Sequence, residues 1–400
     1  MTKAEERVFI AGAGPVGMTA AARLLALDVP VTVFEIGHEL SMESRASTFH
    51  PSTLDMLDEL GATHGLDANG LRAPYLQYRS KSDGILARFD FGDIADLTSH
   101  PYRLQCEQWH LTRVFYDLLK KNSNFEILFR HAVEDCEQDD DGVTVNVRSG
   151  NTTKKRKGHF LIGADGASSK VRHALDIDFE GFTWPERFLV LSTPFEFKKH
   201  IPDLDLVSYV ADTDQWHFLL RIPGLWRVML PISSDMTDEV ALGQDYARRC
   251  LDWVLDGAGT AEIKHRTLYR VHQRVAKTFR RGRAFLVGDA AHVNNPLGGM
   301  GMNGGIHDAV NLTGLLAEVW TSHAPVERLD LYDRQRRTVT LDAVQTQTIQ
   351  NKKDLEASNK EDKESFRKRL QEALSSTDGT RTYVQKLAMI TSLKQASQIA

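Results

Sequence analysis

The chain has 400 residues, of which 42% are hydrophobic and 26% are charged, a composition typical of globular proteins and not of disordered or fibrous ones. Its 49 basic and 54 acidic residues give a formal charge of −5, so a nucleic-acid partner is not expected. The three cysteines lie far apart, and the 15 histidines show no HxH or HExxH spacing. This argues against a disulfide framework and predicts no metal site.

The sequence shows no sign of a membrane segment or an export signal. The N-terminal residues are polar and charged, and they lead directly into a strand-like segment. No later run approaches the roughly 18 apolar residues that suggest a membrane-spanning helix. We therefore expect a cytoplasmic protein of two or three domains with no membrane partner.

The first 35 residues predict a strand, a glycine turn, a helix and a second strand. Gly12, Gly14 and Gly17 have the spacing GxGxxG, and Glu35 closes the second apolar run, 18 positions after Gly17. In such a unit the first glycine allows a tight turn, the second lets a pyrophosphate approach, and the third lets helix and strand pack closely. The acidic residue accepts hydrogen bonds from a ribose. We predict a dinucleotide site, and this motif alone leaves FAD and NAD open.

Two later segments also place a turn directly after a buried-type strand. The run 160–164 ends at Asp165-Gly166 and is followed by Arg172, and the run 284–287 ends at Gly288-Asp289. A glycine-rich turn over 298–305 follows, and then a helix to about residue 320. Glycine lets a ligand approach the backbone closely, and the start of a helix offers free N–H groups.

The rest of the chain divides by its periodicity. Residues 72–100 and 181–275 alternate and are rich in aromatic and β-branched side chains, which predicts an inserted antiparallel sheet. Residues 328–400 are mostly helical, and Phe366, Leu370, Ala373 and Leu374 form an apolar stripe typical of a docked helix. The basic run 154–157 is interpreted as a solvated turn. The predicted fold is α/β with a mostly parallel sheet, an inserted antiparallel sheet and a helical C-terminal extension.

The three motifs, in this order, resemble those of the aromatic-ring flavoprotein monooxygenases, the family of para-hydroxybenzoate hydroxylase, over about residues 6–340. The resemblance implies a Rossmann-like FAD-binding domain at 1–72, 101–180 and 276–340. It implies a substrate-binding domain at 73–100 and 181–275, with 341–400 as the C-terminal extension. It also implies that NADH or NADPH reduces FAD, and that O₂ then forms a C4a-hydroperoxyflavin that hydroxylates a small aromatic substrate.

The resemblance assigns residues to the cofactor. Arg45 is expected near the flavin phosphates, Gln108 against the flavin, Asp289 on the ribityl chain, and 298–303 at the pyrimidine ring. Asp165 matches a motif implicated in binding both FAD and NAD(P)H. The full expected set is Gly12, Ala13, Gly14, Pro15, Val16, Gly17, Glu35, Arg45, Gln108, Asp165, Gly288, Asp289, Gly299, Gly301, Met302 and Asn303.

Simpler alternatives stay open. Arg45 could be a surface residue, Asp165 could cap the next turn, and His292 could be a core histidine. A second complete GxGxxG is absent from the sequence, so no separate NAD(P)H domain is expected. A flavin oxidoreductase that does not insert oxygen is the alternative function, and a non-catalytic flavin protein is a further one. A homodimer is compatible with the sequence, which does not fix the oligomeric state.

The segment 215–222 is the candidate substrate wall. With the two-residue period of a strand, His217 and Arg221 share one face, and Phe218 lies on the other. We expect Arg221 to anchor a substrate carboxylate and His217 to act as a base, unless this face is solvent-exposed. The resemblance places Pro296 over the substrate. Tyr209 and Tyr269 are candidate partners for a phenol, so the expected substrate is a hydroxylated aromatic or N-heteroaromatic acid.

Overall fold

The structure is a computed structural model that describes residues 5–43, 45–212, 215–322, 324–357 and 359–400. Its first layer is an eight-stranded sheet with a parallel centre, in which β1 pairs with β2 on one side and with β11 on the other. In sheet order the strands are β17 (Arg280–Arg281), β18 (Ala284–Leu286), β11 (Thr152–Gly163), β1 (Glu5–Ala11), β2 (Val31–Glu35) and β8 (Phe125–Phe129), with β10 (Gly142–Ser149) on β11 and β9 (Ala132–Asp139) on β10.

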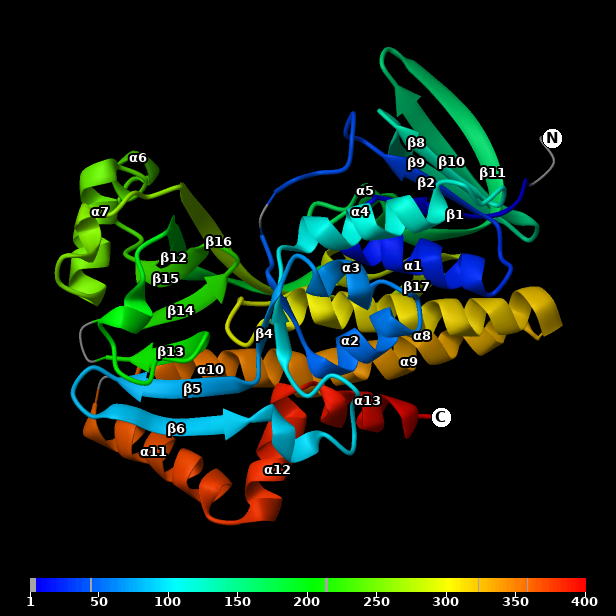
Figure 1. Cartoon of the computed structure of the whole chain (residues 1–400). Coiled ribbons are helices and arrows are strands. Elements are labelled where there is room, and N and C mark those ends of the chain that lie inside the picture. Colours follow the sequence, from blue (N-terminus) through cyan, green and yellow to red (C-terminus); the bar gives the residue numbers. More distant parts are fainter. Residues whose placement is uncertain (1–4, 44, 213–214, 323, 358) are drawn as a thin grey trace.

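A second eight-stranded sheet lies to one side of the first (Figure 1). Its strand pairs are antiparallel apart from β13 with β5, and it joins strands that are far apart in the sequence. Their order is β19 (His292–Val293), β16 (His265–Ala276), β12 (Phe179–Thr193), β15 (Leu225–Ile232), β14 (His217–Ile222), β13 (Val207–Ala211), β5 (Tyr75–Ser80) and β6 (Gly84–Asp90). A small third sheet holds β3 (Thr48–Phe49), β7 (Arg103–Gln105) and β4 (Leu71–Ala73).

Helices fill the space around and between these sheets. Near the first sheet are α1 (Pro15–Ala26), α2 (Pro51–Asp58), α3 (Thr63–Asp67), α4 (Gln108–Leu119), α5 (Lys170–Ala174), α8 (Met300–Ser322) and α9 (Asp330–Val339). On the second sheet are α6 (Asp238–Ala241) and α7 (Gln244–Val254). A π-helical turn at Thr340–Gln345 leads into the C-terminal helices α10 (Thr346–Leu355), α11 (Lys360–Leu374), α12 (Thr377–Leu387) and α13 (Ile390–Ser397).

The helix α8 begins earlier than the sequence suggested. Gly301 and Asn303 lie in its first turn, so the glycine-rich turn ends at Gly299 and does not extend to residue 305. The later glycine of this segment serves packing between helices and not a turn. A β-carbon on Gly305 would lie 2.7 Å from the Val16 side chain and 2.8 Å from the Gly288 backbone. The late glycines of this motif therefore let α8 approach α1.

The antiparallel sheet has two buried faces, which alternate along each strand. We define the inner face by Tyr209, Phe218, Leu220 and Met229, which pack with the C-terminal helices and with Leu297. The outer face, with Leu219 at its centre, packs against α7. The inner face is therefore directed toward the glycine turn, whereas the outer face points away from it.

The C-terminal helices dock on the antiparallel sheet, as Figure 1 shows for α11 beside β6. Phe366 and Leu370 are buried in the same cluster as the inner face, whereas Leu374 at the end of the stripe is 40% exposed. The interpretation of this segment as a docked amphipathic helix is confirmed. Among the described residues, no helix is both long enough and apolar enough to cross a bilayer.

The predicted fold class is confirmed: a mixed α/β fold with a parallel sheet, an antiparallel sheet and C-terminal helices.

The basic run 154–157 lies in β11 and not in a turn, because the turn to β10 falls just before it. Its Arg156 pairs with Glu5 and Glu126, and its Lys157 pairs with Asp139. The boundaries of the three predicted domains remain a prediction.

A buried polar cluster holds the turn that follows β18. The Asp308 carboxylate accepts hydrogen bonds from the Gly288 amide at 3.1 Å, the His292 ring at 2.7 Å and the Arg336 guanidinium at 2.8 Å. All three side chains are buried, so His292 is a core histidine in this structure. Burial acts to raise the pKa of Asp308, but His292 and Arg336 outweigh it and lower that pKa to about 2.

We predict that Asp308→Asn lowers the free energy of unfolding by about 3 kcal/mol at pH 7, because it breaks a buried ion pair. The folded pKa of about 2 lies below the ordinary value of 3.8, so this stabilisation is present above pH 4 and is lost as the pH falls toward 2. Urea unfolding of the wild type and the variant should therefore converge on acidification. The control Asp117→Asn removes a partner of Lys120 in a pair whose two side chains are both exposed, and it should cost less than about 1 kcal/mol. A loss that does not depend on pH would contradict this account.

Candidate functional site

The first glycine motif, from Gly12 to Gly17, packs against the turn that follows β11. Gly12 has φ +99°, and a β-carbon there would lie 2.5 Å from the Ala164 carbonyl oxygen. A β-carbon on Gly17 would lie 2.1 Å from the Gly12 carbonyl oxygen. At Gly14, in contrast, no described atom beyond Gly14 and its two chain neighbours lies within 4 Å of the β-carbon position. Gly12 and Gly17 thus serve packing, and Gly14 leaves open space at the start of α1.

The start of α1 fits an anionic ligand. Gly14 is its N-cap, Pro15 occupies the first turn, and in the described part of the chain no side chain caps these amides. Glu35 lies beside them, and its two carboxylate oxygens accept hydrogen bonds from the amides of Ala13 at 2.8 Å and Gly37 at 2.7 Å. A carboxylate offers about four acceptor positions, so Glu35 can still accept from a ribose.

Asp289 lies close enough to Arg45 for the arginine's positive charge to affect its carboxylate. Asp289 is solvent-exposed, yet desolvation by the chain around it raises the pKa of its carboxylate, whereas the charges of His292 and Arg45 lower it. No hydrogen bond from a described residue reaches the Asp289 carboxylate. Arg45 is exposed and pairs with Glu43 at 2.6 Å. Both side chains are therefore placed to meet a ligand.

Gln108 lies beside Arg45. Its side-chain oxygen accepts from the Ala46 amide at 3.3 Å, and its backbone amide donates to the Ala46 carbonyl at 3.0 Å. These contacts join the first turn of α4 to the segment that carries Arg45. The structure thus brings together two of the predicted cofactor residues that are 63 positions apart in the sequence.

Asp165 caps a helix. Its carboxylate accepts hydrogen bonds from the Ser169 hydroxyl at 2.5 Å and from the amides of Lys170 and Val171 at 2.7 and 3.1 Å. Arg172 in turn donates to the Ala290 carbonyl at 2.9 Å, which ties the second motif to the third. These contacts match the capping alternative. A cofactor role for Asp165 remains a prediction.

The third motif forms a tight turn between β19 and α8. Gly298 and Gly299 have φ +106° and +70°, a left-handed region that favours glycine. Asn303 fixes the turn, since its amide donates to the carbonyls of Thr48 at 2.9 Å and Gly299 at 2.7 Å. Pro296 is exposed beside it. Gly301 and Met302 follow this turn in the first turn of α8, and Gly288 lies against Gly305 of the same helix.

The inner face of the antiparallel sheet meets this turn through a tyrosine. The Gly298 amide donates a hydrogen bond of 3.0 Å to the Tyr209 hydroxyl oxygen. The Tyr209 ring stacks on Phe218 at 4.6 Å and on Tyr78 at 5.6 Å between ring centroids. Tyr269 shares a face with Phe188, which is also an inner-face residue. The aromatic wall that faces the glycine turn is therefore built from these rings.

His217 and Arg221 lie on the outer face, so their expected position next to the substrate is corrected. Arg221 pairs with Glu196 at 3.1 Å and lies over the Trp226 ring. His217 is buried against the Trp253 ring, and burial lowers its pKa to about 3, which makes it a poor base near neutral pH. The two-residue period correctly put them on one face. It could not tell which face is directed toward the glycine turn.

Two buried arginines near the turn were missed by the sequence analysis. Arg227 is on the inner face and donates to the Ser47 hydroxyl at 3.0 Å and the Arg45 carbonyl at 3.2 Å. Arg103 lies in β7 and is fully buried. The period of β15 would have placed Arg227 beside Met229 on one face. No signal in the sequence would have shown that the short strand with Arg103 is buried.

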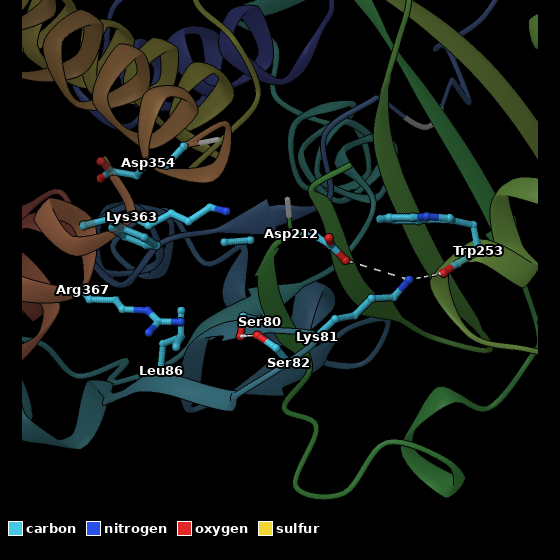
Figure 2. Close-up of a pocket in the computed structure, with 12 residues that line it drawn as sticks. Ser80, Lys81, Ser82, Leu86, Asp212, Trp253, Asp354, Lys363 and Arg367 are labelled. Carbon is cyan, nitrogen blue, oxygen red and sulfur yellow. Dashed lines mark hydrogen bonds and ion pairs between the residues drawn. The ribbon is translucent and has the colours of Figure 1, made fainter. Parts of the chain in front are cut away.

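A cleft of about 460 Å³ opens at the far end of the antiparallel sheet (Figure 2). Figure 2 shows Lys81 extending toward Asp212 and the Trp253 carbonyl, with Lys363 and Arg367 of α11 across from it. Of the described residues that line this cleft, none comes from the three glycine-containing motifs. The cleft is therefore separate from the candidate site.

Comparisons with known proteins agree with this arrangement. Residues 5–347 match the protein family described as "FAD binding domain". The chain is 34% identical to para-nitrophenol 4-monooxygenase of Pseudomonas sp. (strain WBC-3), over 84% of this chain and 83% of that protein. It is 31% identical to 6-hydroxy-3-succinoylpyridine 3-monooxygenase HspB of Pseudomonas putida, over 88% of this chain and 89% of that protein.

Among solved structures, p-nitrophenol 4-monooxygenase PnpA from Pseudomonas putida superposes with a TM-score of 0.90 at 30% identity, over 97% of this chain and 99% of that chain. The family match spans well over half of the chain, so the predicted family and the FAD cofactor are confirmed. The chain belongs to the FAD-binding class A flavoprotein monooxygenases and is a flavin-dependent aromatic hydroxylase.

Proposed function

We propose that this enzyme hydroxylates a small aromatic or N-heteroaromatic ring that carries a hydroxyl group, with NADH or NADPH as electron donor and O₂ as oxygen donor. The Tyr209 hydroxyl, held at the glycine turn by the Gly298 amide at 3.0 Å, carries this proposal. The names of two relatives, which specify a nitrophenol and a hydroxylated pyridine, support the same class of substrate. A carboxylate on the substrate is no longer part of the proposal, because Arg221 lies on the outer face.

The residues present fit FAD. The open space at Gly14 and the uncapped start of α1 would take the pyrophosphate, and Glu35 would take the ribose of the adenosine. Asp289 would accept from the ribityl chain, and the turn at Gly298 and Gly299 would lie against the pyrimidine ring. When bound, FAD supplies the redox chemistry, which accepts a hydride from the nicotinamide and activates O₂.

The substrate would lie between the glycine turn and the inner face. Tyr209 would donate its hydroxyl hydrogen to the oxygen on the substrate ring, while Phe218 and Met229 supply an apolar surface. These residues exclude water, which protects a reactive oxygen species from unproductive breakdown. Pro296 stands beside the turn and would cover the ring.

A homodimer and the three-part domain division remain further proposals. Light scattering can test the homodimer, and limited proteolysis can test the domain division.

A screen of phenols and hydroxypyridines would test the proposed reaction. For each ring, NADH or NADPH oxidation, O₂ uptake, H₂O₂ and the product mass are measured together. We expect at least one ring to yield a product that has gained one oxygen atom, with little H₂O₂. If every ring that stimulates oxidation gives only H₂O₂, the enzyme reduces oxygen without inserting it into these substrates, and the proposed substrate class is wrong.

We predict that Gly14→Ala and Gly17→Ala separate binding from packing. Gly14 has φ −69° and open space around its β-carbon position, so alanine should leave the stability of the apoprotein within about 0.5 kcal/mol. The methyl group would nonetheless obstruct the pyrophosphate and raise the Kd for FAD about tenfold or more. Gly17→Ala should instead destabilise the apoprotein by about 1–3 kcal/mol, because the Gly12 carbonyl is in the way. Equal FAD affinity in wild type and Gly14→Ala would contradict the assignment.

We also predict that Tyr209→Phe and Arg221→Leu differ in their effect on substrate. Removing the Tyr209 hydroxyl should raise the KM for a hydroxylated ring about fivefold to tenfold, because one neutral hydrogen bond is lost. Arg221→Leu should leave that KM unchanged, since its guanidinium pairs with Glu196 on the outer face. Both variants should keep bound FAD. Steady-state kinetics with a ring found in the screen gives the comparison, and a larger effect at Arg221 would reverse our choice of face.

A further inference from the structure

The cleft beside α11 can hold a small aromatic compound. Its volume is about 460 Å³, within the range of ligand pockets, which begins at about 300 Å³. Leu86, Ala357 and Phe366 supply an apolar lining, whereas the segment 80–82 and α11 supply polar and charged groups. A flat ring with one charged substituent suits this lining, because the ring can lie on the apolar side chains while the substituent meets a side chain of opposite charge.

Lys363 is a cation of this cleft that lacks a counter-ion. Figure 2 shows its side chain extending from α11 into the cleft, and its ammonium forms neither an ion pair nor a hydrogen bond with any described residue. The other charged side chains of the lining are paired: Lys81 with Asp212 at 4.0 Å, Arg367 with Asp83, and Asp354 with Arg369. An anion is the natural complement of the remaining positive charge.

The cleft adjoins the inner face of the antiparallel sheet. Ala211 lines the cleft and follows Tyr209 by two residues on β13, so the two share a face and lie roughly 7 Å apart along the strand. Asp354 also lines the cleft and follows Asn351 by three residues in α10, roughly 4.5 Å along the helix axis. Tyr209 and Asn351 are both hydrogen-bonded to the segment 297–298, at 3.0 and 3.2 Å. The cleft therefore lies next to the proposed substrate position, on the side of α11.

Phe366 belongs both to the cleft and to the aromatic wall of the inner face. Its side chain lines the cleft and is only 4% exposed, and its ring meets the edge of Tyr78 at 5.6 Å between ring centroids. Tyr78 in turn stacks on Tyr209 at 5.6 Å. A ring that moved from the cleft to the glycine turn would pass along this wall, with Phe366 as the first side chain in its way.

We propose that this cleft is the entrance for an anionic aromatic substrate, where Lys363 attracts the anion and Phe366 moves aside to let the ring reach the inner face. The inference rests on the proposed function, which places the substrate at the inner face. Lys363 does not lie at that position, so its charge acts on the passage of the anion and not on its final binding. Reversing that charge should slow entry and exit by the same factor and leave the Kd unchanged.

Stopped-flow absorbance with the oxidised holoenzyme measures entry without turnover, because a ring that arrives beside the flavin changes the flavin spectrum. The probes are 4-nitrophenolate and the neutral ring 4-nitroaniline, which has a similar size, and the flavin is followed at wavelengths where the probes do not absorb. At low salt, Lys363→Glu should lower both rate constants for the anion about fivefold, whereas 4-nitroaniline should enter the wild type and the variant equally fast.

The matched control Lys368→Glu makes the same change of charge on α11 at an exposed residue outside the lining of the cleft, and it should have little effect. Phe366→Leu tests the passage with the opposite sign. A smaller side chain should raise both rate constants for both probes about threefold and leave the Kd nearly unchanged, while the Tm and the FAD occupancy show whether α11 stays docked. If α11 detaches in this variant, the comparison of Lys363→Glu with Lys368→Glu decides.

Equal rates in the wild type and Lys363→Glu, or an equal loss in Lys368→Glu, overturn the inference. A change in Kd that comes from the exit rate alone also overturns it, since Lys363 would then touch the bound ring. Unchanged rates in a folded Phe366→Leu variant would place the passage elsewhere. If no ring perturbs the wild-type flavin, the proposed substrate position fails and this inference fails with it. If the wild type hydroxylates a ring that enters Lys363→Glu equally fast, only the entrance falls.

Discussion

The close approach of three backbone turns is the constraint on which the rest of this structure depends. Ala164 leaves no room for a β-carbon on Gly12, and Val16 and Gly288 leave none on Gly305. Any side chain at these positions would push the second or third motif away from the first. Because they stay together, the open space at Gly14, the Glu35 carboxylate and the Asp289 carboxylate belong to one region.

The antiparallel sheet adds a further constraint, because only one of its two faces is directed toward the glycine turn. Its outer face is covered by α7, and Arg221 on that face pairs with Glu196. Its inner face sends Arg227 to the Arg45 carbonyl and Tyr209 to the Gly298 amide. The first contact ties the sheet to the segment after β2, and the second ties it to the glycine turn. In the proposed function, the substrate binds on this inner face, whose polar groups reach across to Arg45 and Gly298.

The spacing of glycine and apolar residues predicted the first motif well, because all of its parts lie within about 30 adjacent residues. The glycine spacing, the helix and Glu35 all lie where the sequence placed them. Longer-range features were harder to predict. A strand's period assigns His217 and Arg221 to one face, but only the packing of α7 decides that this face points away. Likewise, a glycine-rich sequence by itself indicates a turn, whereas Gly305 in the structure lies within α8 and packs against Val16 of α1.

The C-terminal segment shows why a family match over residues 5–347 leaves out part of the site. The Leu387 carbonyl accepts hydrogen bonds from the His50 ring at 2.7 Å and from Arg103 at 3.0 Å. The other ring nitrogen of His50 lies 3.3 Å from the β-carbon position of Gly299. Met389 adopts φ +60°, a strained conformation for a side-chain-bearing residue, where the chain turns from α12 to α13. Since the end of α12 holds His50 beside Gly299, the C-terminal helices pack against the glycine turn and support its position.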